Sequence, residues 1–208
     1  MLALFDIEKW LDKGGLALAA AIVFAESGLL IGFFLPGDSL LFVAGFLSSG
    51  SGHHVMPALP VTAGVIFIAA VAGDQVGYIF GRKVGPSLFD RPRSRLFNPA
   101  NVARAHAFFE RRGPVAIVLA RFVPVVRTFT PIVAGVAEMK YRTFVTYNLL
   151  GGFLWAVGVT TLGYFLGEIE FVKNNLEVAA LVIVAISLLP VWIEYRRHRR
   201  ETHAPSPE

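Results

Sequence analysis

Four charged residues lie within two long apolar stretches of this sequence, where a charge is costly. Glu26 and Asp38 belong to one stretch, and Arg121 and Arg127 belong to another. A charged side chain at the centre of a bilayer costs about 2.5–3.5 kcal/mol on insertion scales. The acids and the arginines balance in number, so we expect the four side chains to face one another or a wet cavity.

The residues around Arg127 favour an anion as the ligand. Thr128, Thr130 and Pro131 follow it, and Thr130 can cap a helix that has Pro131 at its first position. Arg127 would then lie beside a helix N-terminus, which attracts negative charge. Arginine also binds phosphate through a planar fork. The pattern predicts a pocket for an anionic headgroup, with Arg121, Arg127, Thr128 and Thr130 as its binding residues.

Acidic side chains in the same apolar stretches are candidates for proton coupling. Glu26 or Asp38 could bind a proton and release it as the anion enters or leaves. Asp74 lies within the apolar segment 61–81, where it could hydrogen-bond a broken segment or take part in proton movement; we favour the structural role. The alternative for all the buried charges is a salt-bridge cluster that only pins segments together. Buried pairs stabilise less than apolar packing, so we prefer the functional interpretation.

Both charged stretches are apolar and long enough to span a membrane, but each is broken in the middle. The helix-breaking residues are Pro36 and Gly37 in the stretch 26–47, and Pro124 and Pro131 in the stretch 115–136. An arm of about ten residues is about 15 Å long, which reaches only the bilayer midplane. We therefore expect two re-entrant hairpins, with kinked full spans as the alternative.

Other segments are continuous and long enough to cross a bilayer, namely 61–81, 142–167 and 176–194. Lysine and arginine crowd the segment 82–112, which we expect to end in an interfacial helix, and the tail 196–208. The loop 48–60 has neither. Because positive loops stay cytoplasmic, the first hairpin should open outside, the second should open inside, and the C-terminus should be cytoplasmic.

The composition agrees with a single membrane domain, 1–195, followed by a basic tail. Of the 208 residues, 55% are hydrophobic and only 16% are charged. The absence of cysteine excludes disulfides, iron–sulfur clusters and thiolate zinc sites, and no histidines have metal-ligand spacing. We expect no metal and no cofactor. The net charge of +4 reflects membrane topology rather than nucleic-acid binding.

The same short motifs occur twice, which predicts an inverted repeat of about 26–81 and 115–167. The first copy has FLP at 34–36, AG at 44–45 and GYIFG at 77–81, and the second has FVP at 122–124, AG at 134–135 and GYFLG at 163–167. Chance similarity of apolar, glycine-rich sequence is the alternative. The expected fold is therefore an all-α polytopic membrane protein, in which each repeat is a hairpin plus a span and 176–194 is an extra helix. Packing roles are expected for Gly73, Gly77, Gly81, Gly135, Asn148 and Trp155.

At these residues the sequence resembles the DedA family, a branch of the VTT or SNARE-associated Golgi protein superfamily. The matching stretches are FAESGLLIGFFLPGDSLLFVAG, GDQVGYIFGRKVG, ARFVPVVRTFTPIVAGVAEM and NLLGGFLW, within about residues 20–168. The family's required acidic pair matches Glu26 and Asp38, and its required arginine pair matches Arg121 and Arg127. The resemblance implies a bacterial inner-membrane protein that translocates undecaprenyl phosphate or phospholipids and depends on the proton gradient.

The leading hypothesis is thus a proton-linked flippase or scramblase, not an enzyme, whose partners are lipids with phosphate headgroups and protons. A proton-driven exporter of small ions or drugs is the alternative, although the arginines would repel a cation. A membrane-embedded lipid pyrophosphatase is disfavoured because the broken segments contain no histidine. A scaffold without transport activity also stays open, as do the identity of the lipid, the side on which the N-terminus lies, and a homo-oligomeric state.

Overall fold

A computed structural model describes residues 2–28, 37–49, 56–89, 109, 111 and 113–170 of the chain. All regular structure within these residues is helical, as expected. Several predictions concern residues outside this part: Pro36, the motif 34–36, most of the basic segment 82–112, the final span 176–194 and the tail 196–208.

The predicted spans 61–81 and 142–167 are confirmed as long apolar helices. Helix α3 runs over Leu59–Phe89, and Leu59–Gly85 is long and apolar enough to cross a membrane. The second span, Tyr141–Leu166, consists of α7 (Tyr141–Gly152), the π-helical segment η2 (Phe153–Val157) and α8 (Gly158–Leu166). Large apolar side chains stay exposed on both spans, for example Ile68, Phe153 and Phe165. Exposed apolar surface of this kind suits contact with lipid.

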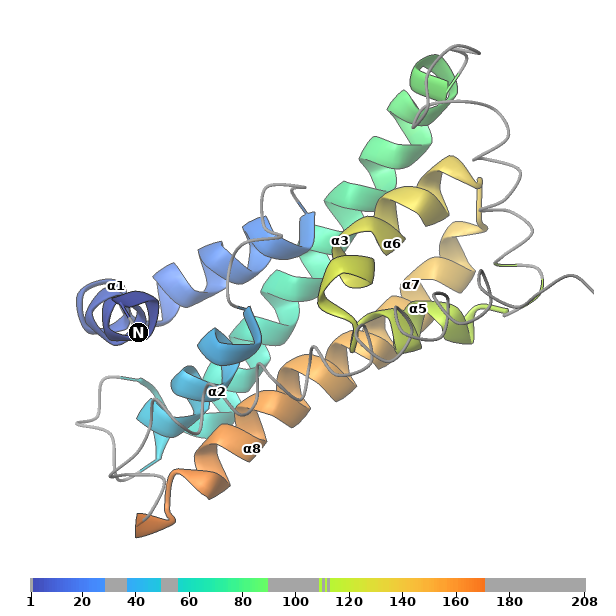
Figure 1. The fold of residues 1–208 in the computed structure, drawn as a ribbon. Coiled ribbons are helices and arrows are strands. Elements are labelled where there is room, and N and C mark those ends of the chain that lie inside the picture. Colours follow the sequence, from blue (N-terminus) through green and yellow to red (C-terminus); the bar gives the residue numbers. More distant parts are fainter. Residues whose placement is uncertain are drawn as a thin grey trace, which may run out of the picture.

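The first broken segment is longer at its start than the sequence pattern predicts. Helix α1 covers Leu2–Gly28 and bends at Gly15, whose φ of 55° is in the left-handed region that glycine tolerates. Figure 1 shows the part before this bend turned away from the rest of α1. The apolar arm therefore begins at Gly15 and not at residue 26. The alanine-rich run after Gly15 forms helix readily, and it continues without interruption through Glu26. Helix α2, Gly37–Ser48, is the second arm.

The second broken segment breaks earlier than expected. Helix α5 spans Val115–Ala120, and α6 spans Pro124–Val136. Pro124 takes the first helical position, where a missing N–H costs nothing, and extended Val123 is the N-cap residue. The predicted helix start at Pro131 is therefore wrong, since Pro131 lies inside α6. The predicted cap by Thr130 is also wrong, because its hydroxyl donates to the Val126 carbonyl oxygen at 2.7 Å.

Two close helix crossings join the halves of the protein. Helix α2 packs on α8, where a Cβ at Gly45 would overlap the Thr160 carbonyl and a Cβ at Gly163 would overlap the Phe42 carbonyl. Helix α6 packs on α3 through Gly135, the counterpart of Gly45, and through Gly81, which is the last glycine of its motif whereas Gly163 is the first glycine of its own. Each broken segment thus lays its second arm on the span that follows the other broken segment.

The crossings lie toward opposite ends of the molecule. Gly167, after α8, approaches Phe46 and Ser49 at the end of α2. Gly85, near the end of α3, approaches Val136 at the end of α6. In Figure 1 the α2–α8 pair and the end of α6 accordingly lie at opposite ends of the long helices. In each broken segment the first arm (α1 or α5) ends, and the second arm (α2 or α6) begins, between these two ends of the molecule.

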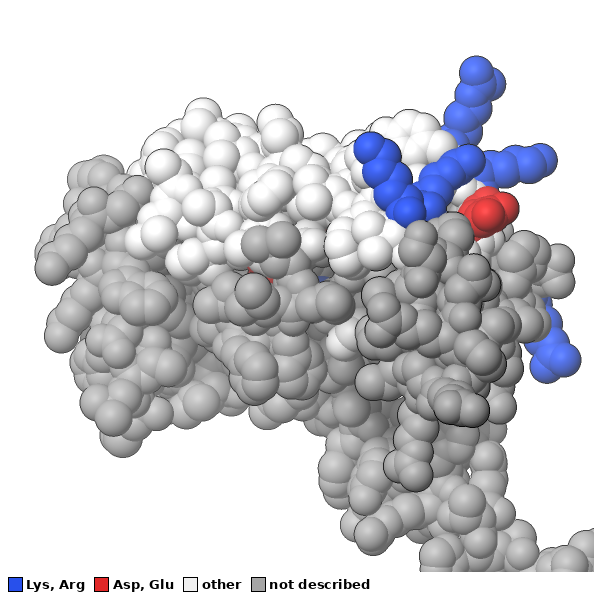
Figure 2. Space-filling model, turned by 90° about the horizontal axis from the view of Figure 1, so that it is seen from above, with Lys and Arg blue, Asp and Glu red and all other residues white. Residues whose placement is uncertain are grey.

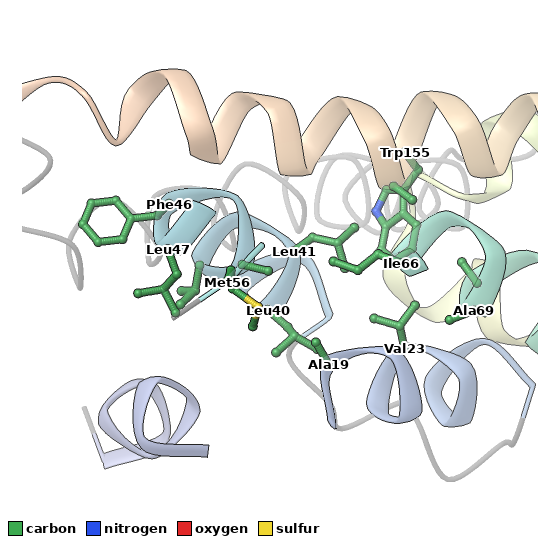
Figure 3. Packing of buried hydrophobic residues seen from close by; sticks show 14 residues of the cluster. Ala19, Val23, Leu40, Leu41, Phe46, Leu47, Met56, Ile66, Ala69 and Trp155 are labelled. Carbon is green, nitrogen blue, oxygen red and sulfur yellow. The ribbon is translucent and has the colours of Figure 1, made fainter. Parts of the chain in front are cut away.

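A buried apolar cluster packs α1, α2 and α3 against η2. Figure 3 shows its side chains converging from four elements: Ala19 and Val23 of α1, Leu40 and Leu41 of α2, Ile66 and Ala69 of α3, and Trp155 of η2. A third close approach supports this packing, because Gly73 of α3 lies against the backbone of α1 at Phe24 and Gly28. The cluster therefore fixes where α1 ends and α2 begins, which are the positions that carry Glu26 and Asp38.

Candidate functional site

Arg127 is the centre of a buried ion-pair cluster built from three helices. It projects from the first turn of α6, and its Nη1 lies 2.5 Å from Oδ1 of Asp38 in the first turn of α2. Its Nη2 pairs with Oε1 of Glu26 in the last turn of α1. The exposed fractions are 9% for Arg127, 8% for Asp38 and 2% for Glu26. The two broken segments therefore meet through opposite charges, with water largely excluded.

Arg121 forms a second cluster with different partners. It lies in the break between α5 and α6, and its Nη2 pairs with Asp74 of α3 and donates to Oδ1 of Asn148 at 2.5 Å. All three residues are buried. The sequence predicted that Arg121 and Arg127 would share Glu26 and Asp38, but in the structure Arg121 pairs with Asp74. Asp74 hydrogen-bonds a broken segment, as its favoured structural role requires.

Trp155, for which the sequence predicted only a packing role, connects the two clusters. Its Nε1 donates to Asp38 Oδ1 at 2.8 Å. Its ring lies under both guanidinium groups, with Cζ of Arg127 at 4.5 Å and Cζ of Arg121 at 5.8 Å from the ring centroid. Distances of this size are typical of cation–π contacts. A tryptophan seven residues after Asn148, on the same helix face, was the available sequence signal.

The charges of the two clusters do not balance. Glu26, Asp38 and Asp74 face Arg127 and Arg121, so the described clusters contain three carboxyl groups and two guanidinium groups. Among the described residues, Oε2 of Glu26 is buried without a hydrogen-bond partner. It lies against Gly37, where a Cβ would overlap it. An excess buried carboxyl group of this kind is suited to bind a proton, because an unpaired buried charge is costly.

The predicted hydroxyl residues stand close to Arg127 on α6. Thr128 and Thr130 are buried at 3% and 8% exposure. The Thr130 hydroxyl donates to the Val126 carbonyl oxygen within the same helix. Pro131, one residue later, packs near Gly77 of α3, which places α6 against the glycine-rich face of that span. The remaining predicted packing residues, Gly73, Gly81 and Gly135, lie at the helix crossings.

Basic side chains gather at one end of the molecule. Figure 2 shows Lys and Arg side chains projecting together there, beside an acidic side chain. The exposed basic residues of the described part are Arg82, Lys83, Arg111, Lys140 and Arg142, and Glu138 is exposed near them. This is the end at which α3 and α6 finish and α7 begins. The apolar surface of the spans is thus bounded by positive charge on one side.

Comparisons with known proteins show that this chain is similar to membrane proteins. A model of the VTT domain matches residues 35–165. The chain is 45% identical to Protein DedA of Escherichia coli (strain K12) over 184 residues, which are 88% of this chain and 83% of that protein. It is 44% identical to Uncharacterized membrane protein Rv0364 of Mycobacterium tuberculosis (strain ATCC 25618 / H37Rv), with 97% and 91% covered. It is 38% identical to Inner membrane protein YghB of Escherichia coli (strain K12), with 81% and 76% covered. No solved structure matches the chain.

Proposed function

The chain belongs to the VTT-domain family of membrane proteins, which includes the protein DedA, and from this premise we propose that it carries an anionic phospho-lipid across the inner membrane in a step coupled to proton binding. The observation that carries the proposal is the Arg127 cluster. Two broken segments bring one guanidinium and two carboxyl groups together inside an apolar protein. Undecaprenyl phosphate is the favoured lipid, and phospholipids are the other candidates.

The chemistry of Arg127 links the anion to the proton. Both of its terminal nitrogens are paired with carboxylates. A lipid phosphate needs the same N–H donors, since it binds the arginine fork as a carboxylate does. A phosphate that takes one of these terminal nitrogens therefore displaces a carboxylate, and the freed carboxyl group in a buried site is stabilised by taking a proton. Loss of that proton restores the ion pair and expels the phosphate.

The arrangement of helices supports access from both sides. The first broken segment opens toward the end where α2 and α8 finish, and the second opens toward the basic end where α3 and α6 finish. We assign the basic end to the cytoplasm because positive loops are retained there. The two segments are then re-entrant hairpins related as an inverted repeat, with the Arg127 cluster between them. Transporters with inverted repeats bind their substrates at such a midplane position.

The direct test is lipid movement in proteoliposomes. Labelled undecaprenyl phosphate and labelled phospholipids are followed across the bilayer, with and without a pH gradient, for the wild type and for Arg127→Ala. We expect gradient-dependent movement of at least one phospho-lipid by the wild type and none by the variant. The mechanism fails if Arg127→Ala, inserted to the same level, moves lipid at the wild-type rate.

A proton-driven exporter of small cations is the second candidate. The excess of one carboxyl group over the guanidinium groups in the described clusters favours it. The two functions differ in what drives proton flux. Proton release triggered by a cation in vesicles of uncharged lipid would support the exporter, whereas proton uptake that requires a phospho-lipid would support the carrier.

A further inference from the structure

The two carboxylates that hold Arg127 have unequal surroundings. Oδ1 of Asp38 accepts from Arg127 Nη1 at 2.5 Å and also from Trp155 Nε1 at 2.8 Å. Glu26 pairs with Arg127 through Oε1, and its Oε2 has no partner among the described residues. If Arg127 turned away, Asp38 would keep the indole N–H of Trp155 as a side-chain donor, whereas Glu26 would keep only the backbone of Gly37.

The position of Trp155 in its helix is also unusual. It lies within η2, the π-helical segment that interrupts the span Tyr141–Leu166. Such segments insert an extra residue, turn the helix face that follows, and are frequent at functional sites. Before it, Gly151 and Gly152 pack against Arg121; after it, Gly163 packs against α2. The segment thus places the indole where the helix changes partners, between Arg121 on one side and Asp38 of α2 on the other.

We propose that Trp155 is a positioning residue that anchors Asp38 as the permanent partner of Arg127, so that Glu26 is the carboxylate that exchanges with the lipid phosphate and carries the proton. The inference rests on the function proposed above and divides that function between the two acids.

The indole also determines which edge of Arg127 is available. The ring covers a face of the guanidinium, with Cζ at 4.5 Å from the centroid, and cation–π contact leaves the N–H edges free to donate. Nη1 stays on anchored Asp38, so Nη2 is the edge that Glu26 releases to phosphate. The charged groups around Glu26 are Arg127 of α6 and Asp38 of α2; on α3, Asp74 is already paired with Arg121. Among the residues that the structure describes, Glu26 forms an ion pair with Arg127 and with no other cation.

Tryptophan fluorescence tests the anchor without any transport. Trp10 and Trp192 are the other tryptophans, and Trp10→Phe with Trp192→Phe leaves Trp155 as the sole reporter. In that background we expect Asp38→Asn to change the emission maximum, because the indole N–H loses a charged acceptor, and the matched Glu26→Gln to leave it unchanged. Equal effects of the two substitutions would overturn the anchoring role.

Transport in proteoliposomes tests whether Glu26 and Asp38 have the different roles proposed for them. We expect Glu26→Gln to remove the dependence on the pH gradient. Asp38→Asn should slow lipid movement at every pH while keeping that dependence. Trp155→Phe, which keeps a ring and loses the N–H donor, should slow movement about tenfold, as the loss of one hydrogen bond to a charged group predicts, and should change the pH profile. Phe144→Leu, at a buried ring of the same span that stacks on Tyr78, is the packing control and should keep the wild-type profile.

The outcomes separate this inference from the proposed function. If the wild type moves phospho-lipid but Glu26→Gln still responds to the gradient, or Trp155→Phe keeps the wild-type pH profile, the inference is wrong and the carrier function stands. If the wild type moves no phospho-lipid, the carrier function fails, and the fluorescence comparison alone still decides whether Trp155 anchors Asp38.

Discussion

Glu26 and Arg127 are separated by 101 residues in the chain and form a buried ion pair where two broken helical segments meet. Neither residue can keep its charge at low cost without the other, because an isolated buried charge is strongly disfavoured. Asp38 completes this pairing from a third helix. The stability of the junction and the proposed transport step therefore depend on the same atoms.

Removing Arg127 should harm stability and transport for different reasons. Arg127→Ala leaves two buried carboxyl groups without their partner, and breaking a buried pair in this way costs about 3–5 kcal/mol. We expect a lower melting temperature in detergent and no lipid movement. Arg127→Met combined with Glu26→Gln and Asp38→Asn removes the uncompensated charge, so it should recover most of the melting temperature and still move no lipid. Recovery of transport in the triple variant would contradict the carrier mechanism.

The Asp74–Arg121 pair should behave as a coupled structural unit. We expect Asp74→Ala and Arg121→Ala to lower the free energy of unfolding by about 3 kcal/mol or more each, because each leaves the other residue buried and unpaired. The double variant should be less destabilised than the sum of the two, which a double-mutant cycle measured by thermal unfolding would show. Additive effects would mean that the pair in the structure does not couple the two residues.

The close crossing of α2 and α8 should not tolerate a methyl group. At Gly163 a Cβ would overlap the Phe42 carbonyl, whereas at Gly158 in the same helix a Cβ would meet nothing within 4 Å. We expect Gly163→Ala to destabilise by about 1–3 kcal/mol, as overpacking does. Gly158→Ala is the matched control, and it should be neutral or stabilise by up to about 1 kcal/mol because alanine is the better helix former. Thermal unfolding in detergent distinguishes them, and equal melting temperatures would argue against the crossing.

The chain contains no cysteine, so single cysteines can report the orientation in the membrane. Ala58 and Glu168 are exposed at one end, and Lys83 and Lys140 are exposed at the basic end. We expect an impermeant maleimide added to intact cells to label Ala58→Cys and Glu168→Cys. Lys83→Cys and Lys140→Cys should react only after the cytoplasmic membrane is opened. Labelling of all positions from outside, or the reverse pattern, would overturn the assignment of the basic end to the cytoplasm.

The sequence predicted a good deal of the fold because the relevant signals are local. Apolar runs of membrane-spanning length predicted the helices Leu59–Gly85 and Tyr141–Leu166, since length and composition alone decide whether a segment can span. Glycine and proline near the charges predicted interrupted segments. The exact helix ends could not be predicted from the sequence. Pro124 and Pro131 can each begin a helix, and only the observed start of α6 distinguishes them.

The sequence by itself determined that Glu26, Asp38, Arg121 and Arg127 had to be buried with partners, because ionised side chains in apolar segments are too costly to leave unpaired. Only the tertiary structure decided which partner each one has. Arg127 takes both Glu26 and Asp38, and Arg121 takes Asp74 and Asn148. Trp155 lies between them. These choices follow from how closely α6 approaches α3 and α2 approaches α8, at glycines far apart in the chain. The spacing of residues along one segment contains no information about such a distance, so pairing was settled by packing.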